Sequence, residues 1–229
     1  MQVEILPDDA AVARRGAAFI AEQARAAVRT RGQFTLAVSG GRTPWAMLRA
    51  LATMELPWHA LHLFQVDERA APAGDAARNL TNIQASLLDH APLPAANVHA
   101  MAVEAADLPA AARDYAATLQ RVCGMPPVLD LVHLGLGADG HTASLVPGDA
   151  VLQVSDDYVA LTAPYLGHRR MTLSYPMINR ARCVLWLATG AEKREMLARL
   201  LAADASIPAG RVEAGRAVVL ADREAAGVG

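Results

Sequence analysis

Apolar and polar residues follow two distinct patterns along the first part of the chain. From Ala10 to Arg29 the apolar residues recur at helical spacing, and Asp8 and Asp9 precede them as candidate N-caps. Phe34–Val38 and Leu61–Val66 are instead short, mainly apolar runs, which are typical of strands buried on both faces. We therefore predict one long helix followed by two buried strands.

The same two patterns continue to the C-terminus. Further helices are predicted from Pro44 onward and at Leu80–Leu88, Pro109–Cys123 and Glu192–Leu201. Further strands are predicted at Leu129–Leu134, Tyr158–Ala163, Met171–Tyr175, Cys183–Leu187 and Ala217–Leu220. Strands that alternate with helices favour a mostly parallel sheet covered on both faces. The segment Val151–Arg180 is rich in strand signals, and we expect it to form a small antiparallel excursion.

Composition narrows the class of protein. The chain has 229 residues, 53% hydrophobic and 19% charged, with a formal net charge of −2. These values are typical of a compact globular protein, and we expect a single domain over residues 1–229. We expect neither a nucleic-acid partner, because there is no broad basic field, nor a membrane, because no apolar run approaches the roughly 20 residues needed to span one. Two widely spaced cysteines and the lack of a secretory signal favour a cytoplasmic location.

The first segment that could carry chemistry is Ser39-Gly40-Gly41-Arg42-Thr43-Pro44. In open parallel sheets, ligands bind beyond the carboxyl ends of the strands, and this segment follows a predicted strand. Two glycines allow a sharp turn and a close approach to a ligand, and Thr43 is a candidate cap for the helix that Pro44 begins. The free N–H groups of such a helix end favour a phosphate. The alternative is a plain turn between strand and helix.

A second segment, Asp67-Glu68-Arg69, directly follows the predicted strand Leu61–Val66. Three charged residues in this place face either solvent or a cleft. A surface ion-pair cluster is the alternative to a functional site. The position at the carboxyl end of a strand favours the site.

The third segment is the glycine-rich run from Gly135 to Ser144, GLGADGHTAS. Its first six residues match the dinucleotide fingerprint GxGxxG, but Asp139 would place a negative charge beside the pyrophosphate, and Pro147 cuts the following helix to about one turn. What remains is a loop that presents Asp139 and His141. Histidine is the side chain best suited to general-base work at neutral pH, and a carboxylate can fix its tautomer. Either Asp67 or Asp139 is a candidate for that partner.

A fourth group consists of Arg170, at the start of a predicted strand, and Lys193, in the first turn of a predicted helix. A cation disfavours a helix N-terminus unless an anion binds there, so Lys193 indicates an anion site. A solvated lysine is the alternative. The chain lacks GxSxG, GKS or GKT, and HExxH motifs, so covalent and metal-dependent mechanisms have little support.

Taken together, these segments resemble the 6-phosphogluconolactonase family in order and spacing. The matching blocks are SGGRTP, DERAAP followed by Asn79, GLGADGHTASLVP, RMTLS and GAEK. Two positions depart from the family pattern. Arg78 stands where the family usually has serine, and Val146 replaces a common phenylalanine.

The resemblance implies a Rossmann-like, three-layer α/β/α fold and the hydrolysis of 6-phospho-D-glucono-1,5-lactone in the oxidative pentose phosphate pathway. It implies no cofactor, with the sugar phosphate lactone as the small-molecule partner. We expect no metal and a monomer or weak homo-oligomer. His141 is then the general base on water, Arg69 stabilises the oxyanion, and Asp67 orients Arg69 or the water. The residues expected to act in catalysis are His141, Asp67, Arg69 and Asp139. Those expected to bind substrate or phosphate are Ser39, Gly40, Gly41, Thr43, Asn79, Gly137, Arg170 and Lys193.

Two rival functions follow from the same fold. Glucosamine-6-phosphate deaminases resemble the chain in the GGxTP and DGH blocks, but they supply a glutamate five residues after the histidine, where this chain has Val146. The second rival is a non-catalytic sugar-phosphate-binding domain, which would bind the same ligand without turnover.

Overall fold

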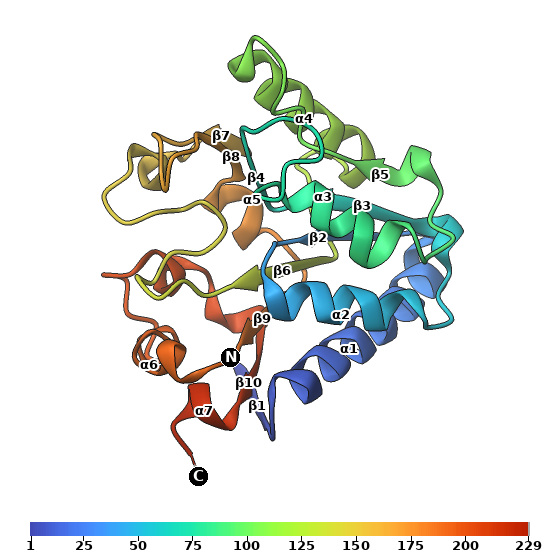
Figure 1. Ribbon diagram of the computed structural model, residues 1–229. Coiled ribbons are helices and arrows are strands. Elements are labelled where there is room, and N and C mark those ends of the chain that lie inside the picture. Colours follow the sequence, from blue (N-terminus) through green and yellow to red (C-terminus); the bar gives the residue numbers. More distant parts are fainter. Residues whose placement is uncertain (229) are drawn as a thin grey trace.

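A seven-stranded parallel sheet forms the centre of the computed structural model, which describes residues 1–228 (Figure 1). Gly229, the last residue of the expected domain, lies outside the described residues. The strand order is β1-β10-β9-β6-β2-β3-β5, and every neighbouring pair is parallel. The strands are β1 (Gln2–Leu6), β2 (Phe34–Val38), β3 (Leu61–Gln65), β5 (Val98–His99), β6 (Leu131–Gly135), β9 (Val184–Ala188) and β10 (Ala217–Asp222). The mostly parallel sheet is thus confirmed.

A second, three-stranded antiparallel sheet lies beside the first. Its order is β4 (Asp67–Arg69), β8 (Arg170–Leu173) and β7 (Val159–Leu161). The antiparallel excursion predicted within Val151–Arg180 is confirmed by β7 and β8. The third strand, β4, comes from the DER segment, which therefore pairs with a strand about a hundred residues later in the chain.

Helices cover both faces of the large sheet, as expected for a three-layer α/β/α fold. They are α1 (Asp9–Arg31), α2 (Arg42–Ala52), α3 (Asn79–Ile83), α4 (Leu108–Cys123), α5 (Tyr175–Asn179), α6 (Arg194–Leu201) and α7 (Arg223–Ala226). A π-helical turn, Gln84–Leu88, extends α3. The predicted first helix is confirmed, since the Asp8 carboxylate caps α1 by accepting from Ala11 N at 2.7 Å.

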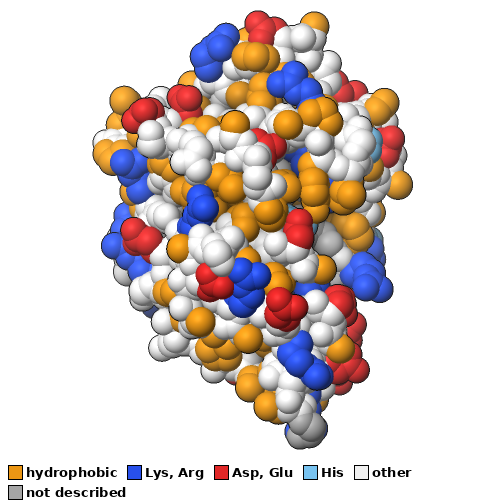
Figure 2. Space-filling view, turned by 90° about the vertical axis from the view of Figure 1, so that its left-hand side faces the viewer, with side chains coloured by type: hydrophobic (Ala, Val, Ile, Leu, Met, Phe, Trp, Pro, Cys, Tyr) orange, Lys and Arg blue, Asp and Glu red, His pale blue; other side chains and the backbone are white. Residues whose placement is uncertain are grey.

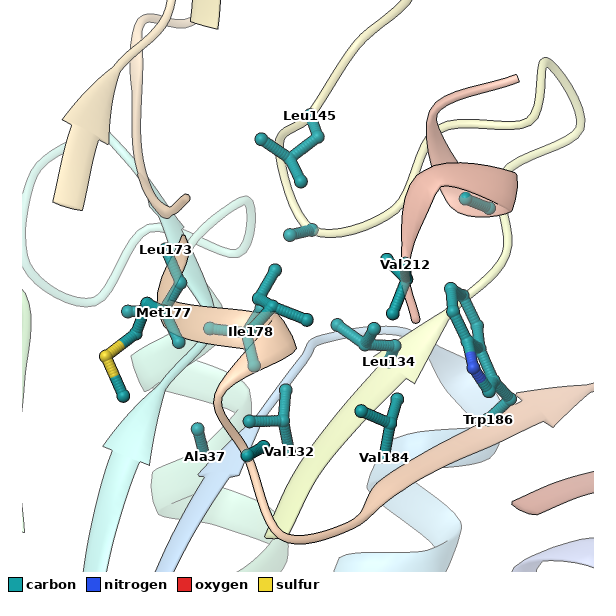
Figure 3. Packing of buried hydrophobic residues seen from close by; sticks show 14 of the residues in the cluster. Ala37, Val132, Leu134, Leu145, Leu173, Met177, Ile178, Val184, Trp186 and Val212 are labelled. Atoms are coloured by element: carbon teal, nitrogen blue, oxygen red, sulfur yellow. The ribbon is translucent and has the colours of Figure 1, made fainter. Parts of the chain in front are cut away.

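The core consists of two clusters, one on each face of the sheet. Successive residues of a strand belong to different clusters, because side chains alternate across a sheet. Leu36 packs with α1 and α2, whereas Ala37, its neighbour in β2, packs with α4 and α5. Figure 3 shows part of the cluster that contains Ala37, with Met177 and Ile178 of α5 close to residues of β2, β6 and β9. Continuous apolar strands are therefore needed, since both faces are covered.

Several predicted element boundaries were wrong. Tyr175 begins α5 rather than ending a strand, because Pro176 suits the first turn of a helix and ends β8 two residues earlier. The strand predicted at Leu129–Leu134 is β6, which begins at Leu131. Two edge strands of the large sheet were missed, as was β4 of the small sheet. β5 has only two residues, and β1 exposes part of its apolar side chains at the sheet edge, so neither carries a continuous apolar run.

None of the helices in residues 1–228 has the length and hydrophobicity required to traverse a bilayer. Figure 2 shows basic and acidic side chains interspersed over the face of the molecule that lies at the left of Figure 1. This face carries α6 and α7 (Figure 1).

Candidate active site

A cavity of about 310 Å³ lies at the carboxyl ends of β2, β6 and β9. Its lining includes, from the predicted site, Ser39, Gly40, Gly41, Thr43, Asp67, Arg69, Asn79, Gly137, His141, Arg170 and Lys193. The structure thus brings together all four predicted segments. Asp139 is the one predicted site residue that does not line the cavity, but it contacts His141, which does.

His141 and Asp139 form a hydrogen-bonded pair at the edge of the cavity. His141 Nδ1 lies 2.5 Å from Asp139 Oδ1, which also accepts from His141 N at 3.1 Å. Burial raises the pKa of Asp139, but the charge of His141 and the hydrogen bonds from His141 and Tyr165 outweigh it and lower the pKa. Because the carboxylate accepts, Nδ1 donates, which leaves the Nε2 lone pair free to take a proton. Of the two candidate partners of His141, Asp139 is the one in contact.

Gly137 leaves the space that this pair occupies. A Cβ at position 137 would lie 2.1 Å from His141 Nδ1 and 2.6 Å from Asp139 Oδ1. The loop closes on itself through a hydrogen bond from Gly137 N to His141 O. Glycine is therefore required here because the ring and the carboxylate fold back over the backbone.

Asp67 is buried in a separate hydrogen-bond network. Its Oδ2 accepts from Ser144 Oγ at 2.6 Å, and its Oδ1 accepts from Asn79 Nδ2 at 3.2 Å. Only 4% of Asp67 is exposed. Within residues 1–228 Asp67 forms no ion pair with Arg69, so the expectation that Asp67 orients Arg69 directly has no contact to support it.

Glu68, a functional candidate that sequence reasoning missed, binds the backbone of two segments that meet beside the cavity. The side chain is fully buried, and its two oxygens accept from the backbone N–H groups of Arg69, Asn79 and Leu80, each at 2.8 Å. Arg78 Nε lies 3.7 Å from Glu68 Oε2. Arg78, which replaces the usual serine, is thus explained as a buried partner of Glu68. The only signal in the sequence is an acidic residue between Asp67 and Arg69.

The SGG turn rests on a buried histidine. Ser39 N donates to His133 Nδ1 at 3.3 Å, and Ser39 Oγ donates to the His133 carbonyl at 3.0 Å. Complete burial lowers the pKa of His133 to about 3, so the ring is neutral and acts as an acceptor. A Cβ on Gly40 would lie 1.9 Å from Asn79 Oδ1, so only glycine fits against that side chain.

Helix α2 begins at this turn with Arg42, two residues earlier than expected. Gly41, with φ of 124°, is the N-cap, and no side chain within residues 1–228 caps the helix. Thr43 lies inside the first turn instead, where its hydroxyl is 2.7 Å from that of Thr189, so the predicted cap at Thr43 was wrong. The backbone N–H groups of an uncapped, eleven-residue helix favour an anion at this end.

Two arginines face each other across the small sheet. Arg69 of β4 is directly opposite Arg170 of β8 in the antiparallel register, and like charges in this arrangement destabilise a sheet. The Nε atoms of both are buried and, within residues 1–228, have no hydrogen-bond partner. Burial and then the charge of Arg69 lower the pKa of Arg170. An anion between the two guanidinium groups would relieve both the repulsion and the unpaired donors.

The cavity as a whole is rich in unpaired positive charge. Its lining cations are Arg42, Arg69, Arg170 and Lys193, and its lining carboxylates are Asp67 and Glu192. In the described part of the chain, none of these four cations forms a salt bridge. Lys193 ends a 3₁₀ turn, Ala191–Lys193, immediately before α6. The arrangement is suited to a small, doubly charged anion such as a phosphate monoester.

A neighbouring cavity has the opposite character. Its volume is about 560 Å³, and its lining includes Asp8, Asp9, Glu192, Asp222 and Glu224. These carboxylates repel an anion, so the smaller cavity is the better candidate for a sugar phosphate. Among residues 1–228, no three His, Cys, Asp or Glu side chains gather closely enough to hold a metal ion.

Comparison with known proteins places the chain in a family. The family model of glucosamine-6-phosphate isomerases/6-phosphogluconolactonase matches residues 7–221. The chain belongs to this family.

Individual relatives agree with the family match. A 6-phosphogluconolactonase from a Nostoc species is 37% identical over 89% of this chain and 86% of its own length. The solved 6-phosphogluconolactonase from Trypanosoma brucei superposes with a TM-score of 0.87 at 28% identity, covering 99% of this chain and 97% of its own. A monomeric glucosamine-6-phosphate deaminase gives a TM-score of 0.85 over the whole of both chains at 20% identity, a likeness of fold alone.

Proposed function

We propose that this protein is a 6-phosphogluconolactonase, which hydrolyses 6-phospho-D-glucono-1,5-lactone to 6-phosphogluconate in the oxidative pentose phosphate pathway. One observation carries the proposal. The Asp139-supported imidazole of His141 lines the same cavity as the uncapped end of α2 and four cations without ion-pair partners. A base near a phosphate-binding site suits a phosphorylated substrate that is attacked by water.

The reaction proceeds by general-base catalysis. His141 Nε2 takes a proton from a water molecule, whose oxygen attacks the lactone carbonyl carbon. The negative charge that develops on the carbonyl oxygen is stabilised by Arg69, which lines the cavity and forms no salt bridge within residues 1–228. When the tetrahedral intermediate collapses, the bond between the carbonyl carbon and the ring oxygen breaks, and the imidazolium returns its proton to that oxygen.

The rest of the cavity positions the substrate. The backbone at Gly40 and Gly41, together with Thr43, Arg170 and Lys193, holds the 6-phosphate. Asp67 and Asn79, joined by a hydrogen bond, shape the adjoining wall. A lactone is an already reactive ester, so activated water and a charge stabiliser are sufficient, and the mechanism uses no cofactor or metal.

The deaminase alternative has less support. Val146 occupies the position at which that family supplies a glutamate, and it is buried with 5% of its surface exposed. A non-catalytic binding domain would have no need of the hydrogen bond that orients the imidazole of His141.

The decisive experiment is a rapid assay of freshly prepared lactone with the spontaneous hydrolysis subtracted, run in parallel with glucosamine 6-phosphate. We expect rapid turnover of the lactone and no release of ammonia from the amino sugar. Lactone hydrolysis at the spontaneous rate would overturn the proposal, and ammonia release would favour the deaminase.

We further propose that the protein acts in the cytoplasm as a monomer or weak homo-oligomer. All the proposed site residues come from one chain, and all but Asp139 line one cavity, which supports a site that needs no partner subunit. Light scattering after size exclusion, combined with the activity at decreasing protein concentration, tests this point. A specific activity that falls on dilution would contradict it.

A further inference from the structure

Tyr165 contacts both the Asp139–His141 pair and Arg170 without lining the cavity. It lies in the turn between β7 and β8, and its hydroxyl donates to Asp139 Oδ2 at 2.9 Å. That oxygen is the one His141 does not use, because His141 binds Oδ1. The Tyr165 ring also meets the imidazole edge to face, with ring centroids 5.6 Å apart.

The same residue holds Arg170. The guanidinium carbon of Arg170 lies 4.9 Å from the centre of the Tyr165 ring, and Arg170 Nη2 donates to the Tyr165 carbonyl at 3.4 Å. A cation over an aromatic face is attracted by the ring quadrupole. Tyr165 therefore contacts the arginine proposed to bind phosphate as well as the carboxylate of the proposed dyad.

The backbone of this turn is held in an unusual conformation. Leu166 and Gly167 both have positive φ, 49° and 83°, as in a type I′ turn, and Tyr165 N donates to His168 O at 2.9 Å. Leucine rarely adopts this conformation, and its side chain gains no burial here because it is 77% exposed. Backbone strain of this kind persists where the surrounding contacts enforce it. The contacts that hold this turn are those of Tyr165 with Asp139 and Arg170.

We propose that Tyr165 is a positioning residue that joins the anion-binding Arg170 to the Asp139–His141 pair. The inference rests on the proposed lactonase function. Its hydroxyl fixes the orientation of the Asp139 carboxylate, and hence of the imidazole, while its ring and carbonyl fix Arg170. Substrate that orders Arg170 thereby also orders the base.

Two substitutions separate these contacts. Tyr165→Phe removes the hydroxyl and keeps the ring and the carbonyl, so we expect kcat to fall about three- to tenfold with KM within about twofold of wild type. Tyr165→Ala also removes the ring, so KM should rise by a further factor of about three. Tyr158→Phe is the matched control, because Tyr158 is likewise partly exposed beneath an arginine, Arg180, but is not part of the site.

A double-mutant cycle shows whether Tyr165 acts through Asp139. In an Asp139→Asn background, Tyr165→Phe should lower kcat by less than twofold, because the group that it positions is already altered. Unchanged kcat in the Tyr165→Phe single variant, or fully additive losses in the double variant, would overturn the inference.

A measurement that does not need turnover separates this inference from the proposed function. The ring ¹⁵N signals of His141 should shift in Tyr165→Phe and stay in place in Tyr158→Phe. Unshifted signals in both variants would overturn the positioning role even if the protein is a lactonase. If the wild-type protein fails to hydrolyse the lactone, the proposed function is wrong, and shifted signals would still support the contact between Tyr165 and the pair.

Discussion

The two acidic segments of the site are built in opposite ways. The first, which we call the buried floor, consists of Asp67, Glu68 and Asn79, whose exposed fractions are 4%, 0% and 1%. The second, the dyad loop, spans Gly137–His141, and the side chains of Asp139 and His141 are 39% and 26% exposed. The floor is fixed by several hydrogen bonds per residue, whereas the pair on the loop is accessible to water.

This difference in exposure gives the two regions different roles. A buried, multiply bonded carboxylate such as Glu68 holds backbone and neighbouring side chains in place, so its loss affects folding. A histidine that activates water must reach solvent or substrate, so its loss affects turnover. We therefore expect substitutions in the dyad loop to lower activity and substitutions in the buried floor to lower stability.

The largest effect is expected for His141→Ala. Loss of a general base lowers kcat by about 10²- to 10⁴-fold, while the partly exposed position leaves the thermal midpoint nearly unchanged. Lactone hydrolysis and a thermal melt measured on the same sample check both halves of this prediction. His90→Ala, at an exposed histidine outside the cavity, is the control. A variant with near-normal kcat would remove His141 from the mechanism.

Glu68→Gln is the corresponding change in the buried floor. The amide places an N–H group where the carboxylate accepts from backbone N–H groups, so we expect the free energy of unfolding to fall by about 3 kcal/mol. Urea denaturation followed by circular dichroism measures it. Glu104→Gln, which neutralises the exposed partner of Arg78, should have a much smaller effect. Equal effects of the two variants would contradict the distinction between floor and surface.

Lys193→Ala tests the cations that line the cavity. A charge-assisted contact to phosphate contributes about 1.5–3 kcal/mol, so KM should rise about tenfold or more with little change in kcat. Steady-state kinetics with the lactone give both constants. Arg194→Ala is the matched control, since Arg194 bonds the Glu224 carbonyl and does not line the cavity. An unchanged KM would place Lys193 outside the phosphate site.

The smallest effect, counted per pH unit, concerns the pH dependence of stability beneath the SGG turn. Burial lowers the pKa of His133 from 6.5 to about 3, so as the pH falls from 6.5 to 3 the unfolded chain takes up a proton that the folded chain does not. This difference lowers the free energy of unfolding by up to about 1.4 kcal/mol per pH unit. In His133→Asn, which keeps an acceptor for Ser39 N, the fall should be shallower, and denaturation at several pH values measures it. A slope like that of the wild type, or one equally reduced by His90→Asn, would refute this account.

Much of the fold could be predicted from the sequence because its signals are local. β2, β6 and β9 are buried on both faces and are therefore mainly apolar runs, and the Asp8 cap of α1 lies next to the helix it begins. The site segments were found for a similar reason. Each joins glycines or charges to a strand or helix end, and parallel strands bring their carboxyl ends to one edge.

The tertiary structure alone decided which side chains meet. The sequence offers Asp67 and Asp139 as equal candidates for the partner of His141. Only the fold shows that Asp139 contacts His141, while Asp67 is hydrogen-bonded to Ser144. The opposition of Arg69 and Arg170 depends on the β4–β8 register, and Tyr165 reaches the pair only because the β7–β8 turn packs against the loop. Such contacts join residues far apart in the chain, so their partners follow from register and packing, which local patterns of apolar and polar residues do not encode.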